Sequence, residues 1–128
     1  MHELSLMEAL RDLALAQAQR CGGGRIVAIH LRLGSLAGVD GEALQLAARV
    51  VLEGSAAAGA RLQLEWVQAR CRCPACGLSF EALAGVCECP ACGAISSDVL
   101  QGRELDLVAL DLEEEPQGGG SASSMAPL

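Results

Sequence analysis

Six of the seven cysteines of this chain lie within residues 71–92, and four of them have the spacing of a zinc site. Two Cys-Pro-Ala-Cys-Gly units occur in this stretch, and two residues separate the paired cysteines in each unit. This spacing lets one tight turn direct both sulfurs at the same ion, and four thiolates complete the tetrahedral shell of a structural Zn(II). We therefore predict a closed, non-catalytic zinc site with the ligands Cys73, Cys76, Cys89 and Cys92.

The alternative for these cysteines is a pair of disulfides or a redox-active Cys-x-x-Cys. We find no secretory signal pattern, and neither unit opens a thioredoxin-like βαβ segment, so we favour metal binding. Cys71 and Cys87 flank the two units; they could exchange as ligands, but we interpret them as buried cysteines. Cys21 is interpreted as a small packing residue rather than a ligand.

The composition argues against several classes of function. The formal charge is −7, the nine basic residues are all arginine, and one Trp and one Phe leave little for base stacking. Because phosphate neutralisation dominates nucleic-acid affinity, we expect no nucleic-acid partner. No apolar run approaches the ~20 residues that span a bilayer, so we expect no membrane association. Reduced cysteines with metal spacing suit the cytoplasm.

The remaining sequence predicts a second, larger folding unit. Apolar residues at helical spacing predict a helix over 4–20, with Met7 beside an apolar stripe formed by Leu6, Leu10, Leu13, Ala14 and Gln17. Alternating residues predict strands over 25–33, 60–67 and 104–112. A second helix is expected over 41–53, with Asp40 as its N-cap.

These elements predict an α+β fold in which two helices pack on a three-stranded sheet and a four-cysteine zinc-ribbon lobe is inserted. We assign residues 1–69 and 95–112 to the α+β domain and residues 70–94 to the zinc lobe. Residues 113–128 are acidic and then rich in Gly and Ser, with no hydrophobic period, and we expect a disordered tail.

The N-terminus offers a second set of metal-binding groups. The α-amino nitrogen of Met1, the amide nitrogen of His2 and its imidazole can close fused chelate rings around one ion, and Glu3 could add an oxygen. Such nitrogen donors favour Ni(II) or Cu(II). The alternative is a frayed terminus in which Glu3 merely favours the helix start. The other histidine, His30, lies on a strand and is expected to be exposed or to face a helix edge.

Three features together resemble the HypA/HybF family of nickel-insertion accessory proteins for [NiFe]-hydrogenase maturation. They are the Met-His-Glu-Leu-Ser-Leu start, the Arg-Leu-Gly that ends the first strand, and the cysteine insertion. The resemblance extends from Met1 to Leu112. The cysteine motif alone is shared by many zinc ribbons, whereas a Met-His-Glu start followed by this architecture is far more specific.

The resemblance implies a nickel site at the N-terminus. His2 matches the family's essential nickel ligand, with the Met1 amine and backbone nitrogens completing the site. Glu3 matches an acidic residue that contributes to it, and Asp40 falls where the family carries an acidic residue that approaches the nickel. The four cysteines predicted above match the family's zinc ligands.

The resemblance also implies partners. Family members deliver Ni(II) to the hydrogenase large subunit together with a GTPase called HypB, and some also serve urease; we expect a monomer or weak homodimer here. In some relatives histidines beside the zinc cysteines make the site respond to pH, and this chain has none there.

Two other functions compete with nickel delivery. The first is a zinc-ribbon adaptor whose acidic tail binds a basic partner and which carries no transported metal. The second is an enzyme, against which the closed cysteine site and the presence of only two histidines argue.

Overall fold

The computed structural model describes residues 2–83, 85–113 and 123–127 of the chain. The chain forms two compact units, which are described separately below. The first comprises residues 1–31, 40–64 and 107–128, and the second comprises residues 32–39 and 65–106. Among the described residues, no helix is both long and apolar enough to cross a membrane.

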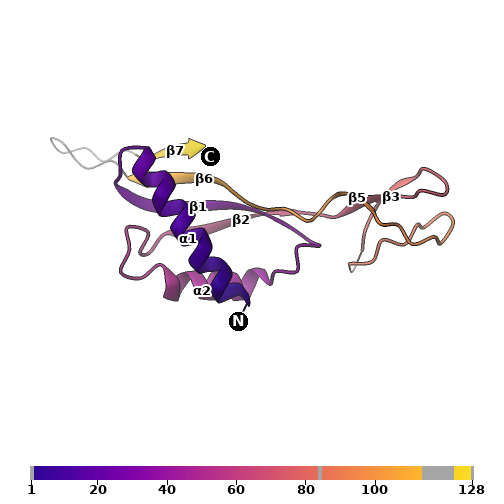
Figure 1. The fold of residues 1–128 in the computed structure, drawn as a ribbon, viewed down its shortest axis with the longest axis horizontal. Coiled ribbons are helices and arrows are strands. Elements are labelled where there is room, and N and C mark those ends of the chain that lie inside the picture. Colours follow the sequence, from indigo (N-terminus) through magenta and orange to yellow (C-terminus); the bar gives the residue numbers. More distant parts are fainter. Residues whose placement is uncertain (1, 84, 114–122, 128) are drawn as a thin grey trace. The chain divides into compact units, whose positions relative to one another are not determined.

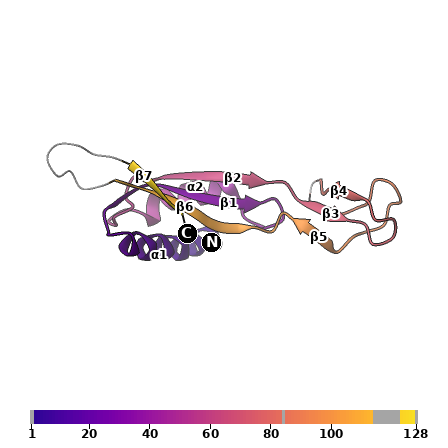
Figure 2. The ribbon, with the colours of Figure 1, turned by 90° about the horizontal axis from the view of Figure 1, so that it is seen from above.

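The first unit combines two helices with most of a four-stranded sheet, three of whose strands continue for two or three residues into the second unit. Its helices are α1 (His2–Arg20) and α2 (Gly41–Val51), which pack against one another. Its strands, in spatial order, are β2 (Arg61–Val67), β1 (Arg25–Gly34), β6 (Leu105–Glu113) and β7 (Ser123–Pro127). Figure 1 shows α1 lying across this sheet, and in Figure 2 β1 and β2 run in the same direction. The predicted α+β class and the order of helices and main strands are confirmed.

The sheet has one more strand than the three predicted. Ser123–Pro127 pairs antiparallel with β6, from Glu113 opposite Ser123 to Ala109 opposite Pro127. The described part of the predicted disordered tail is therefore strand, while residues 114–122 lie outside the described residues. A free strand edge offers unpaired N–H and C=O groups that can accept an extended segment whatever its side chains, so no hydrophobic period is needed.

The core of the first unit comes from both helices and the central strands. On α1 the buried positions are Met7, Leu10, Ala14 and Ala18, whereas Leu13 is 59% exposed. Leu10 and Ala14 are therefore buried as predicted, but Leu13 is not, and Met7 and Ala18 complete the buried face in its place. The two alanines allow α1 to approach its neighbours closely, which the larger Leu13 would prevent. On α2 the buried residues follow helical spacing: Leu44, Ala47, Ala48 and Val51.

The second unit contains a three-stranded sheet in the order β4 (Ser79–Glu81), β3 (Arg70–Arg72) and β5 (Asp98–Gln101). Both neighbours pair antiparallel with β3. The small core beneath consists mostly of cysteine and alanine with one aromatic ring: Ala69, Cys71, Cys73, Phe80, Ala82 and Cys89. So little apolar volume predicts that covalent or metal cross-links must supply much of the unit's stability.

Within the second unit, the backbone of residues 34–36 lies close to that of residues 102–104. The Gly34 N–H donates to the Glu104 carbonyl at 2.7 Å, and the Leu36 N–H donates to the Gly102 carbonyl at 2.6 Å. A Cβ on Gly34 would lie 2.1 Å from the Gly102 oxygen, so only glycine fits there. The Ser35 hydroxyl accepts the Ala69 N–H at 2.9 Å. These bonds make residues 32–39 part of the second unit.

Candidate metal centres

The four predicted zinc ligands converge in the second unit. The sulfurs of Cys73, Cys76, Cys89 and Cys92 all lie within 4.8 Å of one another. Cys73 Sγ lies 3.5 Å from Cys92 Sγ, and Cys76 Sγ lies 3.6 Å from Cys89 Sγ. In each pair one cysteine is buried and the other exposed, so the cluster lies at the surface of the small core. Four sulfurs at this separation fit a tetrahedral Zn(II), which thiolates bind at about 2.3 Å.

Two matching turns create this convergence. In the first, Gly77 donates its N–H to the Cys73 carbonyl at 2.8 Å and has a φ of 79°. In the second, Gly93 does the same to the Cys89 carbonyl at 2.8 Å with a φ of 76°. Both glycines adopt the left-handed conformation that the repeated Cys-Pro-Ala-Cys-Gly pattern predicts.

The thiols in the cluster differ in pKa. The backbone N–H of Cys76 lowers the pKa of the Cys73 thiol to about 6. The Ala94 N–H lowers the pKa of Cys92, but hydrogen bonds to Cys73 and Cys89 outweigh it and raise that pKa to about 11. The cluster is therefore part thiolate and part thiol near neutral pH, and a dication would displace the remaining protons.

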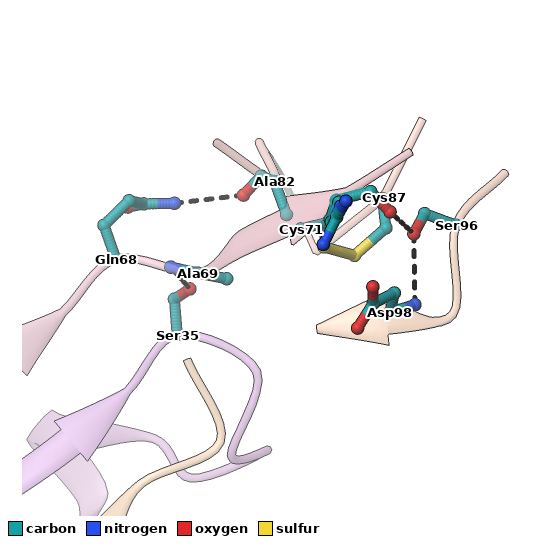
Figure 3. The surroundings of a disulfide bond; sticks show 9 residues. Ser35, Gln68, Ala69, Cys71, Ala82, Cys87, Ser96 and Asp98 are labelled. Carbon is teal, nitrogen blue, oxygen red and sulfur yellow. Dashed lines mark hydrogen bonds between the residues drawn. A yellow bond between two sulfur atoms is a disulfide. The ribbon is translucent and has the colours of Figure 1, made fainter. Parts of the chain in front are cut away.

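Cys71 and Cys87 form a disulfide bond, which corrects their interpretation as plain buried cysteines. Figure 3 shows this bond beside the hydrogen bonds that Ser96 makes to the Arg72 carbonyl and the Asp98 N–H. The Cα atoms lie 6.1 Å apart, within the usual disulfide range. The signal in the sequence was the symmetry of the pair: each cysteine stands two residues before a zinc-site unit. Cys21, expected to pack as a small residue, is exposed.

The N-terminal residues lie in the first unit. Met1 lies outside the described residues, and His2 is the exposed first residue of α1. The first N–H groups of a helix have no carbonyl partner one turn earlier, so the His2 amide nitrogen is not used by the helix.

The two acidic residues of the predicted nickel site are in contact. The Asp40 N–H donates to Glu3 Oε2 at 3.2 Å, a contact that sequence spacing could not reveal. Asp40 also caps α2 as predicted, because its Oδ1 accepts from the N–H groups of Glu42 at 3.0 Å and Ala43 at 3.3 Å. One carboxylate oxygen of Asp40 thus remains outside the cap.

The other histidine is partly enclosed. His30 Nε2 lies 3.2 Å from Asp111 Oδ2, and both side chains are 25% exposed, so His30 is partly enclosed rather than exposed. Within residues 2–83, 85–113 and 123–127, the four cysteines form the one group of three or more side chains whose ligand atoms all lie this close together. His2, Glu3 and Asp40 do not form such a group, although the hydrogen bond described above joins Glu3 to Asp40.

Comparison with known proteins explains why these features occur together. Residues 1–112 match the family model described as hydrogenase/urease nickel incorporation, metallochaperone, hypA. The chain belongs to the HypA family. This confirms the resemblance found in the sequence.

Named relatives of this HypA-family chain include the hydrogenase maturation factor HypA of Chlorobium limicola, which is 36% identical over 89% of this chain and 98% of its own length. HypA of Synechococcus elongatus is 49% identical over 60% of this chain and 69% of its own. The solution structure of the nickel metallochaperone HypA from Helicobacter pylori has the same fold, with a TM-score of 0.62 and 21% identity over 86% of this chain and 96% of that one.

Proposed function

We propose that this chain binds Ni(II) at its N-terminus and delivers it during maturation of [NiFe]-hydrogenase. The observation that carries the proposal is the contact between Glu3 and Asp40 next to an exposed His2 on a HypA-family chain. The terminal amine, the free amide nitrogen and the exposed imidazole form a set of three nitrogen donors, and two carboxylates add negative charge beside it. Ni(II) accepts such a set.

A terminal site suits a protein that must release its ion. The Met1 amine, the His2 amide nitrogen and the His2 imidazole would supply the nitrogens, and Glu3 and the free oxygen of Asp40 would supply negative charge. Because the donors belong to a chain end, few bonds must break when an acceptor takes the ion. Binding must displace protons from the amine and the imidazole, so nickel affinity should fall at acidic pH.

We assign the four-cysteine cluster to structural Zn(II), held by Cys73, Cys76, Cys89 and Cys92. A closed thiolate shell leaves no position for substrate, so the metal would stabilise the second unit rather than catalyse a reaction. The protein would act in the cytoplasm as a carrier rather than an enzyme. Its partners would be a HypB-type GTPase and the hydrogenase large subunit, and urease maturation proteins in organisms that use them.

The test is a calorimetric nickel titration of zinc-loaded protein with its authentic Met1 start. The same titration is made on protein with one extra residue before Met1 and on His2→Ala. We expect tight binding that both changes abolish, because the first displaces the terminal amine and the second removes the imidazole. His30→Ala is the matched control, since it removes the other histidine from the same unit.

Two results would count against nickel delivery. Equal nickel binding in all forms would move the ion away from the N-terminus. Absence of binding in the authentic protein would favour a zinc-stapled adaptor.

A further inference from the structure

The Cys71–Cys87 disulfide connects the two halves of the cysteine cluster. Cys71 lies in β3, two residues before Cys73, and Cys87 lies two residues before Cys89. Each disulfide partner therefore precedes one of the two turns that present zinc-site sulfurs. The bond joins these turns without using any of the four clustered sulfurs, which remain free.

We propose that this pair is a redox-active staple whose oxidation state sets the zinc affinity of the second unit. The inference rests on the proposed zinc site and adds that the redox state of this pair regulates how tightly the site binds zinc. In the dithiol form, zinc must itself bring two separate turns together. In the disulfide form, the connection already exists before the metal binds.

The size of the effect follows from loop closure. The bond spans a sequence separation of 16 residues, and closing such a loop removes conformational entropy from the unfolded chain. Because a small thiolate site assembles as the metal binds, entropy removed beforehand appears as higher zinc affinity. Disulfides closing loops of this size stabilise by an amount equivalent to roughly a hundredfold in affinity. By linkage, bound zinc should make the disulfide harder to reduce by the same factor.

The surroundings of the bond provide a route for a small thiol. Cys71 is fully buried beside Phe80 and Ala82, whereas Cys87 is only partly buried. Cys87 also lines a pocket of about 400 Å³ together with Val86, Ile95 and Arg103. Cys87 is therefore the sulfur that an incoming thiolate attacks, and Cys71 is the leaving sulfur.

The exchange is balanced without any group outside these residues and a small thiol. A thiolate RS⁻ attacks Cys87 Sγ, the bond to Cys71 breaks, and Cys71 leaves as a thiolate that takes a proton. A second RS⁻ attacks the RS sulfur of the mixed disulfide, releases RSSR and leaves Cys87 as a thiolate, which is also protonated. Overall, one protein disulfide and two RSH give two cysteine thiols and RSSR. Oxidation by a small disulfide such as oxidised glutathione is the reverse.

The presence of the Cys71–Cys87 disulfide is tested first. Zinc-loaded full-length protein is treated with oxidised glutathione, alkylated under denaturing conditions and cleaved after arginine and glutamate. The expected product is the dipeptide Cys71–Arg72 joined to residues 82–88, because Cys87 is the only cysteine in that heptapeptide. The proposal is overturned if this product is not found, or if Cys71 or Cys87 is found disulfide-bonded to another cysteine instead.

Zinc affinity is then measured for the oxidised and dithiol forms by competition with a chromophoric chelator. We expect one zinc per chain in both forms and roughly hundredfold tighter binding in the oxidised form. The double variant Cys71→Ser, Cys87→Ser should bind like the dithiol form under both conditions. Cys21→Ser should behave like the parent, because it removes a cysteine from the other unit.

The measurements distinguish a failure of the redox proposal from a failure of the zinc-site proposal. Equal zinc affinity in both redox forms, with one zinc per chain, overturns the staple and leaves the zinc site standing. Absence of zinc binding in both forms overturns the zinc site and the staple together. An equilibrium constant for reduction of the disulfide by glutathione that is unchanged by saturating zinc also overturns the staple, since linkage requires both equilibria to shift by the same factor.

Discussion

The backbone N–H of Asp40 donates a hydrogen bond to the Glu3 carboxylate at 3.2 Å. This bond connects the first turn of α1 to the residue that caps α2. The side chain of Asp40 thus has two candidate roles, as a helix cap and as a source of negative charge beside the predicted nickel ion. Substitutions that separate the roles can decide between them.

Asp40→Asn should keep the stability of the protein and weaken nickel binding. Asparagine caps helices as well as aspartate, so the free energy of unfolding should change little. Loss of one exposed charge near a dication costs about 1 kcal/mol, which is about fivefold in affinity. Thermal unfolding and nickel calorimetry measure the two effects. Asp40→Ala is the comparison, since it should also lose about 1 kcal/mol of stability. Unchanged nickel affinity in Asp40→Asn would leave only the capping role.

Zinc removal from the dithiol form should unfold the second unit and spare the first. Without metal or disulfide, the small cysteine and alanine core cannot hold β3 in place. Trypsin should then cleave faster after Arg70 and Arg72, whereas the rate of cleavage after Arg20 should not change. The helical circular dichroism signal should also not change. Cys92→Ser should reproduce this result, and Cys21→Ser should not. Simultaneous loss of helical signal would show that the two units unfold together.

Zinc affinity should fall as the pH falls, and more steeply below about pH 6. The pKa of Cys73 is lowered to about 6, so at neutral pH this thiol is largely ionised and gives up no proton to the metal. Below that pKa it is protonated, and zinc must displace one more proton. Chelator competition from about pH 8 to about pH 5 measures the slope. A constant slope through pH 6 would contradict this assignment of Cys73.

Gly34→Ala should destabilise the second unit strongly. The new Cβ would lie 2.1 Å from the Gly102 carbonyl oxygen, and a backbone atom cannot move aside as a flexible side chain can. Overpacking of this kind costs about 1–3 kcal/mol or more. Gly41→Ala is the control, because its Cβ meets only the flexible Leu64 side chain at 3.3 Å. Denaturant unfolding compares the two, and equal stabilities would show that the Gly34 backbone can shift.

The parts of the structure that local spacing determines could be predicted from the sequence. The cysteine cluster follows from two repeated turns, and the cap of α2 follows from one aspartate before an apolar stripe. The Glu3–Asp40 contact and β7 each depend on segments far apart in the chain, so no local pattern encodes them. The disulfide had a signal in the matching positions of Cys71 and Cys87, but spacing alone does not distinguish a bonded pair from two buried thiols. The buried face of α1 was predicted wrongly because Leu13 is more hydrophobic than Ala18, yet close helix packing favours the smaller residue.

The hydrogen bonds around Gly34, Ser35 and Gly102 also limit how this protein can be taken apart. A graft of residues 70–94 alone would carry the cysteine cluster but leave behind the core residue Ala69, together with the Ser35 hydroxyl that accepts its N–H. It would also lose β5, which pairs with β3. The metal-binding lobe therefore cannot be moved to another protein as one continuous segment. A graft must include residues 32–39 and 65–106, which are two separate stretches of the chain.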